Sequence, residues 1–96
     1  MLVGTVASFE ILNCPHKVRR ERVARILDQG IDHVFMADHI SFINGLGMDG
    51  LINAATLAAQ DERLKVVVGV YLLALRHPLT VARQLATIAQ SAPGQL

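Results

Sequence analysis

Three short apolar runs alternate with three segments of helical periodicity along this chain, and this alternation limits the folds open to it. The apolar runs cover residues 2–8, 31–37 and 66–71, and the last is the most strongly β-branched. Strands that alternate with helices form parallel sheets joined by right-handed crossovers. We therefore predict an α/β fold with three consecutive parallel strand-helix units.

Signals for the start and end of a helix flank the segments that follow the runs. Residues 16–29 carry an apolar stripe, and Gly30 follows as a helix stop. Asp49 can cap a helix over residues 50–60, and a helix over residues 78–90 has proline at its first position. Each apolar run is thus followed by a helix, as parallel strands require.

Composition and charge exclude several classes of protein. With 52% hydrophobic residues, the chain can bury a core as one compact domain or part of one. Its net charge of +1 gives no field that would attract nucleic acid or anionic lipid.

The longest apolar run, residues 66–75, falls well short of the roughly 20 residues of a membrane span, and we interpret it as one or two buried strands. Cys14 is the only cysteine and no signal peptide precedes it, so we expect a cytoplasmic protein without disulfides or a cysteine-rich metal site.

Basic side chains gather in the first helical segment. They are Lys17, Arg19, Arg20, Arg22 and Arg25. Glu21 lies four residues before Arg25, and no aromatic residue interleaves the cluster for stacking on bases. We expect a solvated outer helix face here in preference to a nucleic-acid site.

The loops after the carboxyl ends of parallel strands form the ligand-binding face of such folds. Here those loops cover residues 9–13, 38–47 and 74–77. Asp38 and His39 directly follow the second run, where an imidazole could transfer protons and a carboxylate could orient it. The alternative is a carboxylate that serves as a turn or cap residue beside a solvated histidine.

Two other histidines have simpler interpretations. Asp32 and His33 stand at the opposite end of the second strand, roughly 20 Å away at about 3.3 Å per residue. They are predicted to form a structural pair and not to share a metal site with Asp38 and His39. His77 precedes a helix, where it could meet an anionic group or cap the backbone.

The glycines of the second loop do not form a nucleotide-binding motif. Gly45, Gly47 and Gly50 lack the spacing of the dinucleotide fingerprint, so we expect a flexible active-site loop. The chain also lacks a Walker sequence, a zinc-protease motif and the residue order of a serine hydrolase.

From Gly30 onward, about two thirds of the chain resembles the luciferase-like monooxygenase superfamily. Three features carry the resemblance jointly. They are Ala37-Asp38-His39 after the second run, the alanine-rich helix leading through Asp61-Glu62-Arg63 into the third run, and Arg76-His77-Pro78 followed by Ala82-Arg83-Gln84.

The resemblance implies a (β/α)₈ barrel and flavoprotein oxidoreductase chemistry. Members of the superfamily use reduced FMN with oxygen, or the deazaflavin coenzyme for hydride transfer, on a small organic substrate. By this resemblance, His39 is the active-site histidine near the isoalloxazine ring, with Asp38 beside it as a second catalytic residue. Gly69 and Val70 fall where the superfamily often packs a cis peptide bond behind the flavin, so they join His39 as expected cofactor-binding residues.

The chain also departs from the family pattern. A Ser-Gly-Gly-Arg turn is usual after the last helix, and this chain has Ser91-Ala92-Pro93-Gly94-Gln95. Strands four to eight, with the main phosphate-binding loops, are absent. Residues 1–96 are therefore expected to be the N-terminal portion of a barrel domain, truncated before strand four, which forms a homo-oligomer or takes its missing strands from a partner. The alternatives are a non-catalytic partial-barrel module and, less favoured, an unrelated small α/β binding protein.

Overall fold

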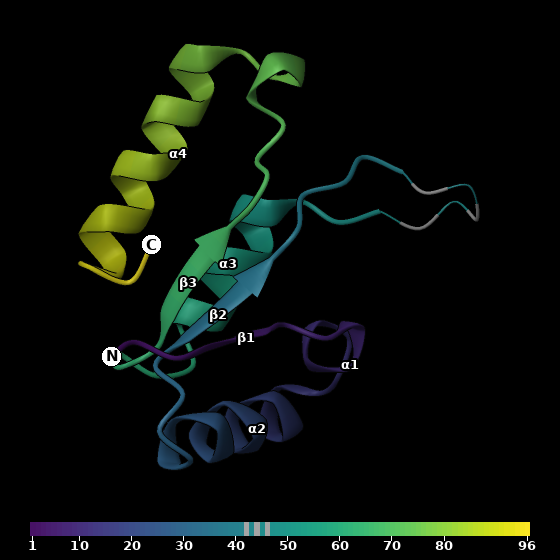
Figure 1. Cartoon of the computed structure of the whole chain (residues 1–96). Helices are drawn as coiled ribbons and strands as arrows, with labels where there is room; N and C mark the ends of the chain where they lie inside the picture. Colours follow the sequence, from purple (N-terminus) through teal and green to yellow (C-terminus); the bar gives the residue numbers. More distant parts are fainter. Residues whose placement is uncertain (42, 44, 46) are drawn as a thin grey trace.

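The computed structural model describes residues 1–41, 43, 45 and 47–96, and it contains a three-stranded parallel sheet (Figure 1). The strands are β1 (Gly4–Val6), β2 (His33–Met36) and β3 (Lys65–Val68), in the order β1-β2-β3. Both pairings are parallel, with Val34 opposite Val66 in the central register. This arrangement confirms the predicted α/β fold with three parallel strands alternating with helices, as in part of a barrel.

The helices are α1 (Phe9–Leu12), α2 (His16–Asp28), α3 (Gly50–Ala58), the single 3₁₀ turn η1 (Leu73–Leu75) and α4 (Pro78–Ser91). Of these, α2, α3 and α4 begin at the predicted residues, whereas α1 and η1 were not predicted. In Figure 1, α2 lies below β1, α3 lies behind β2 and β3, and α4 stands beyond β3. No helix in the described ranges is long and apolar enough to cross a membrane.

Only one face of the sheet belongs to the core. Val34, Met36 and Val66 are buried on this face, together with Val23 of α2 and Leu57 of α3. Side chains alternate along a strand, so the intervening residues point to the opposite face. There, Val6, Phe35 and Val67 remain exposed. The sheet therefore presents an apolar surface on the side that α2 and α3 do not cover.

The first strand is shorter than predicted, and a helical turn replaces part of the expected loop at residues 9–13. The carbonyl of Ser8 accepts hydrogen bonds from Ile11 and Leu12. The guanidinium of Arg19 then donates to the carbonyls of Ile11, Leu12 and Cys14 at 2.8–3.0 Å. The expectation of a fully solvated basic face was thus wrong for Arg19, which is buried because it satisfies the carbonyl groups at the end of α1.

The third strand also ends early, at Val68 and not at residue 71. The expectation that residues 66–75 form only buried strand was wrong, because Leu73 to Leu75 form η1 with Leu73 and Leu75 exposed. The backbone leaves the sheet at Gly69, whose amide still donates to Met36, and turns so that the Leu72 amide donates to Asp38.

Two contacts fix the end of the sheet opposite the predicted ligand face. Asp32 accepts hydrogen bonds from the Val3 amide at 3.1 Å and from Nδ1 of His33 at 2.7 Å, confirming the predicted structural pair. Near the C-terminus, the Gln95 carbonyl accepts from the Val66 amide at the edge of β3. The Gln95 side chain donates to the carbonyls of Ala58, Asp61 and Leu64, so this edge is held by both backbone and side-chain bonds.

Candidate functional site

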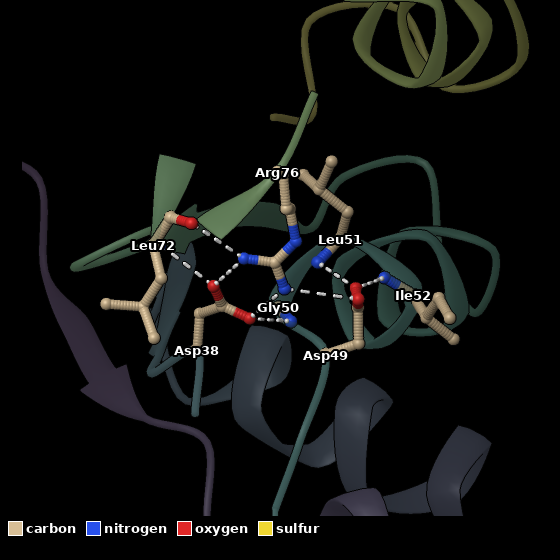
Figure 2. Close-up of polar contacts among 7 residues, drawn as sticks. All are labelled: Asp38, Asp49, Gly50, Leu51, Ile52, Leu72 and Arg76. Atoms are coloured by element: carbon tan, nitrogen blue, oxygen red, sulfur yellow. Dashed lines mark hydrogen bonds and ion pairs between the residues drawn. The ribbon is translucent and has the colours of Figure 1, made fainter. Parts of the chain in front are cut away.

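Three segments converge where the parallel strands end. Asp38 follows β2, and the chain leaving β3 brings Leu72 and Arg76 to the same place. Asp49 and Gly50 arrive at the start of α3. Figure 2 shows these side chains and amides turned toward one another around the Arg76 guanidinium.

Asp38 is the most buried ionisable group at this edge. Its side chain has 0% exposure, and each carboxylate oxygen accepts two hydrogen bonds. The Gly50 amide and Arg76 Nη2 donate to Oδ1, while the Leu72 amide and Arg76 Nη1 donate to Oδ2. A side chain at Gly50 would place its Cβ 2.5 Å from Val68 and 3.0 Å from Asp38 Cβ, so glycine is what allows α3 to start this close.

Arg76 binds more than its acidic partner. Its guanidinium donates to both Asp38 oxygens at 2.6 and 2.9 Å, to the Leu72 carbonyl at 3.1 Å and to Asp49 at 3.3 Å. The same group lies 4.4 Å from the centre of the Tyr71 ring, within the range of a cation–π contact. The planar guanidinium thereby connects the end of β2, the start of α3 and the segment after β3.

The charges of this pair reinforce each other. Burial raises the pKa of the Asp38 carboxyl, but the hydrogen bonds from Arg76, Leu72 and Gly50 together hold it below its ordinary 3.8. The hydrogen bonds to Asp38 raise the pKa of Arg76 above its ordinary value. Burial raises the pKa of Tyr71. The cluster at neutral pH is therefore an ionised arginine, an ionised Asp38 and a neutral phenol.

Asp49 caps α3 and also contacts Arg76. Its Oδ1 accepts from the amides of Leu51 and Ile52 at 3.0 Å, which confirms the predicted helix cap. Its Oδ2 faces Arg76. With two carboxylates around one guanidinium, Arg76 has little attraction left for an additional anion.

His39 lies near the start of the segment between β2 and α3. The His39 amide donates to the Met48 carbonyl at 2.9 Å, and the Met48 amide donates to the His39 carbonyl at 2.7 Å. These two hydrogen bonds join the two ends of the loop. The residue itself is exposed. The Asp38 carboxylate turns toward Arg76 and the backbone amides of Gly50 and Leu72. The catalytic role of His39 and its support by Asp38 stay predictions.

The expected glycine-containing loop falls partly outside the described residues, which exclude Phe42, Asn44 and Leu46. At its base, a Cβ on Gly47 would stand 2.2 Å from the Ile40 carbonyl oxygen. Glycine therefore permits the two sides of the loop base to approach closely.

A cis peptide bond joins Gly69 and Val70, at the position indicated by the family resemblance. Gly69 lies directly against the Phe35 ring, where a Cβ would stand 2.5 Å from Cε2. Val70 is 78% exposed. These residues form an apolar surface next to the end of β2, and their contact with a cofactor stays a prediction.

His77 caps α4 through its own side chain. Its Nδ1 accepts from the Leu79 amide at 3.3 Å, and Pro78 takes the first helical position as predicted. Of the two interpretations open for His77, the backbone cap is the one observed.

Sequence reasoning missed the role of Arg76. The residue forms part of the quoted Arg76-His77-Pro78 motif, but nothing local links it to Asp38, which is 38 positions away. An arginine and an aspartate that each follow a neighbouring parallel strand were the available signal, because those strand ends meet at one edge.

A protein-family match covers most of the chain. Residues 15–96 match the family described as luciferase-like monooxygenase. No curated protein matches the chain.

Proposed function

The chain belongs to the luciferase-like monooxygenase family, and from this premise we propose that it forms part of a flavin-dependent oxidoreductase site. The proposed cofactor is reduced FMN used with oxygen, or the deazaflavin coenzyme, and the proposed substrate is a small organic molecule. The observation that carries the proposal is the apolar surface of Phe35, Gly69 and Val70 at the carboxyl edge of the sheet, the edge at which His39 follows β2.

The shape of this surface fits a flat ring better than a phosphate. Phe35 is 40% exposed, and Gly69 adds no side chain above its ring. An isoalloxazine ring could therefore lie on Phe35, Val67 and Val70 without displacing a polar group. Arg76 is already paired with Asp38 and Asp49, so it does not provide a phosphate site. We propose that these residues hold the ring and that phosphate contacts come from elsewhere.

When bound, the reduced cofactor supplies the electrons or hydride of the oxidoreduction. In the proposal, His39 contacts the ring or moves a proton to or from the substrate, since imidazole groups exchange protons near neutral pH. Asp38 supports His39 through the backbone, because its carboxylate fixes the chain immediately before the histidine. We also propose a cytoplasmic location, which the single cysteine favours.

A second candidate is a non-catalytic partial-barrel module that associates with itself or completes another chain. The exposed sheet face favours it, because Val6 is 69% exposed and Val67 is 45% exposed next to the buried Val66. Sheet edges and apolar faces of this kind promote pairing with further chains. Sedimentation of the protein over a concentration series would detect such self-association.

A fluorescence titration with FMN, and separately with the deazaflavin coenzyme, tests the enzymatic proposal. We expect saturable binding that His39→Ala weakens. The matched control is His33→Ala, which removes a histidine at the opposite end of the same strand. Folded protein that binds neither cofactor would contradict the proposal, and equal weakening by both substitutions would contradict the role of His39.

A further inference from the structure

We propose that Arg76 is a positioning residue that fixes the segment over residues 69–72 against the loop base at His39. This inference rests on the proposed function, in which that segment and His39 face the cofactor ring. It assigns to Arg76 a role in cofactor binding through other residues, without direct contact.

Asp38 and Arg76 together clamp the backbone of Leu72. The Asp38–Arg76 pair holds both backbone groups of this residue: the amide donates to Asp38 Oδ2 at 2.9 Å, and the carbonyl accepts from Arg76 Nη1 at 3.1 Å. Leu72 lies two residues after Val70, which is part of the proposed ring surface. Figure 2 shows both bonds. Without Arg76, the Leu72 carbonyl would keep only the local bond from the Leu75 amide at 3.2 Å, so this segment would be less firmly held to the end of β2.

The same guanidinium also connects to the loop base at His39. Arg76 Nη2 reaches Asp49, which directly follows Met48, and Met48 is paired with the backbone of His39. A shallow hollow is shared by these groups. Its lining is His39, Ile40, Gly47, Met48, Asp49 and Arg76. The Arg76 side chain thus sets the distance between residues 69–72 and the loop base at His39, which form the two sides of the proposed site.

The guanidinium group of arginine is suited to this role. Only a forked, planar cation can donate to both oxygens of Asp38 and still reach Leu72 and Asp49. Lysine keeps the positive charge but has a single nitrogen. Arg76→Lys would therefore keep the positive charge and lose the forked geometry. This substitution separates the contribution of the charge from that of the geometry.

The experiment uses Arg76→Gln and Arg76→Lys, with Arg63→Gln as the matched control. Arg63 makes a two-pronged pair with Asp61, at 3.0 and 2.8 Å, in the turn before β3 at the other end of the sheet, and this pair is more exposed than that of Arg76. Amide hydrogen exchange and FMN or deazaflavin binding are measured for each variant at a temperature where unfolding curves show it folded. A purely structural role would raise exchange in all elements together.

For the Arg76 variants, we expect exchange at Leu72 and Gly50 to rise about tenfold or more while the amides of α2 keep their protection. Flavin affinity should fall on the order of tenfold, the scale typical of residues that hold a binding group in place. Arg63→Gln should change neither quantity. If Arg76→Gln does not fold, Arg76→Lys alone carries the test.

Unchanged Leu72 exchange in the Arg76 variants would overturn the inference, as would faster exchange with unaltered flavin affinity. If the unsubstituted chain binds no flavin, the proposed function fails. The exchange data then still decide whether Arg76 positions residues 69–72.

Discussion

The carboxylate of Asp38 and the guanidinium of Arg76, 38 positions apart in the sequence, form a two-pronged ion pair with distances of 2.6 and 2.9 Å. Their side chains are 0% and 15% exposed. The pair joins the exits of β2 and β3, so the relative position of these two exits depends on it.

Breaking this pair should destabilise the protein. Arg76→Met leaves the Asp38 charge buried without its partner, for which we expect a loss of about 3 kcal/mol in the free energy of unfolding. Adding Asp38→Asn should recover part of that loss, because the unpaired charge is then removed. Urea unfolding of the two single variants and the double variant measures both effects, and a double variant less stable than Arg76→Met would contradict the explanation.

The contribution of Asp38 should also depend on pH. Its folded pKa lies below the ordinary 3.8, so its stabilisation is full above that value and is lost as pH falls through the folded pKa. The stability difference between the unsubstituted protein and Asp38→Asn should therefore be constant near neutral pH and shrink below about pH 4. Comparing the two proteins cancels the effect of Asp61, whose hydrogen bonds with Arg63 lower its pKa to about 2. A difference that grows in acid would contradict this prediction.

Gln95 should stabilise the edge of β3. Its buried amide nitrogen donates to the carbonyls of Ala58, Asp61 and Leu64, and Gln95→Leu would leave those acceptors without this donor. We expect a loss of about 2 kcal/mol in the free energy of unfolding. Gln90→Leu on the exposed side of α4 is the control and should change stability little. Equal effects of the two substitutions would show that the three bonds contribute nothing specific.

Gly69→Ala should impair flavin binding more than folding. The new Cβ would meet the Phe35 ring at 2.5 Å, and this partly exposed ring can turn away only by disturbing the proposed ring surface. We expect a several-fold loss of flavin affinity with a small change in the unfolding midpoint. In a Phe35→Ala background the clash is absent, so Gly69→Ala should then have no further effect on stability.

The pattern of apolar runs was sufficient to predict the three strands and the helices α2, α3 and α4, because each of them packs an apolar face into the core, but it did not predict α1 or η1. Strand ends were less predictable: β3 stops at Val68 because the Leu72 amide is drawn to Asp38, a contact invisible in local sequence. The same reason explains Arg19, whose basic character suggested solvent although nearby carbonyls bury it. The position of Asp38 directly after a strand was enough to select it as a site residue. Its partner Arg76 was not selected, because the two residues come together only where the segments after β2 and β3 meet in the folded structure.

The most direct test of the proposed flavin site is an amide chemical-shift titration of the ¹⁵N-labelled protein with FMN. Our account predicts saturable shifts concentrated at Phe35, His39 and residues 69–71, with little change at Asp32, His33 and Lys65 at the other end of the sheet. Shifts centred on that opposite end, or no shifts from a folded protein, would contradict it.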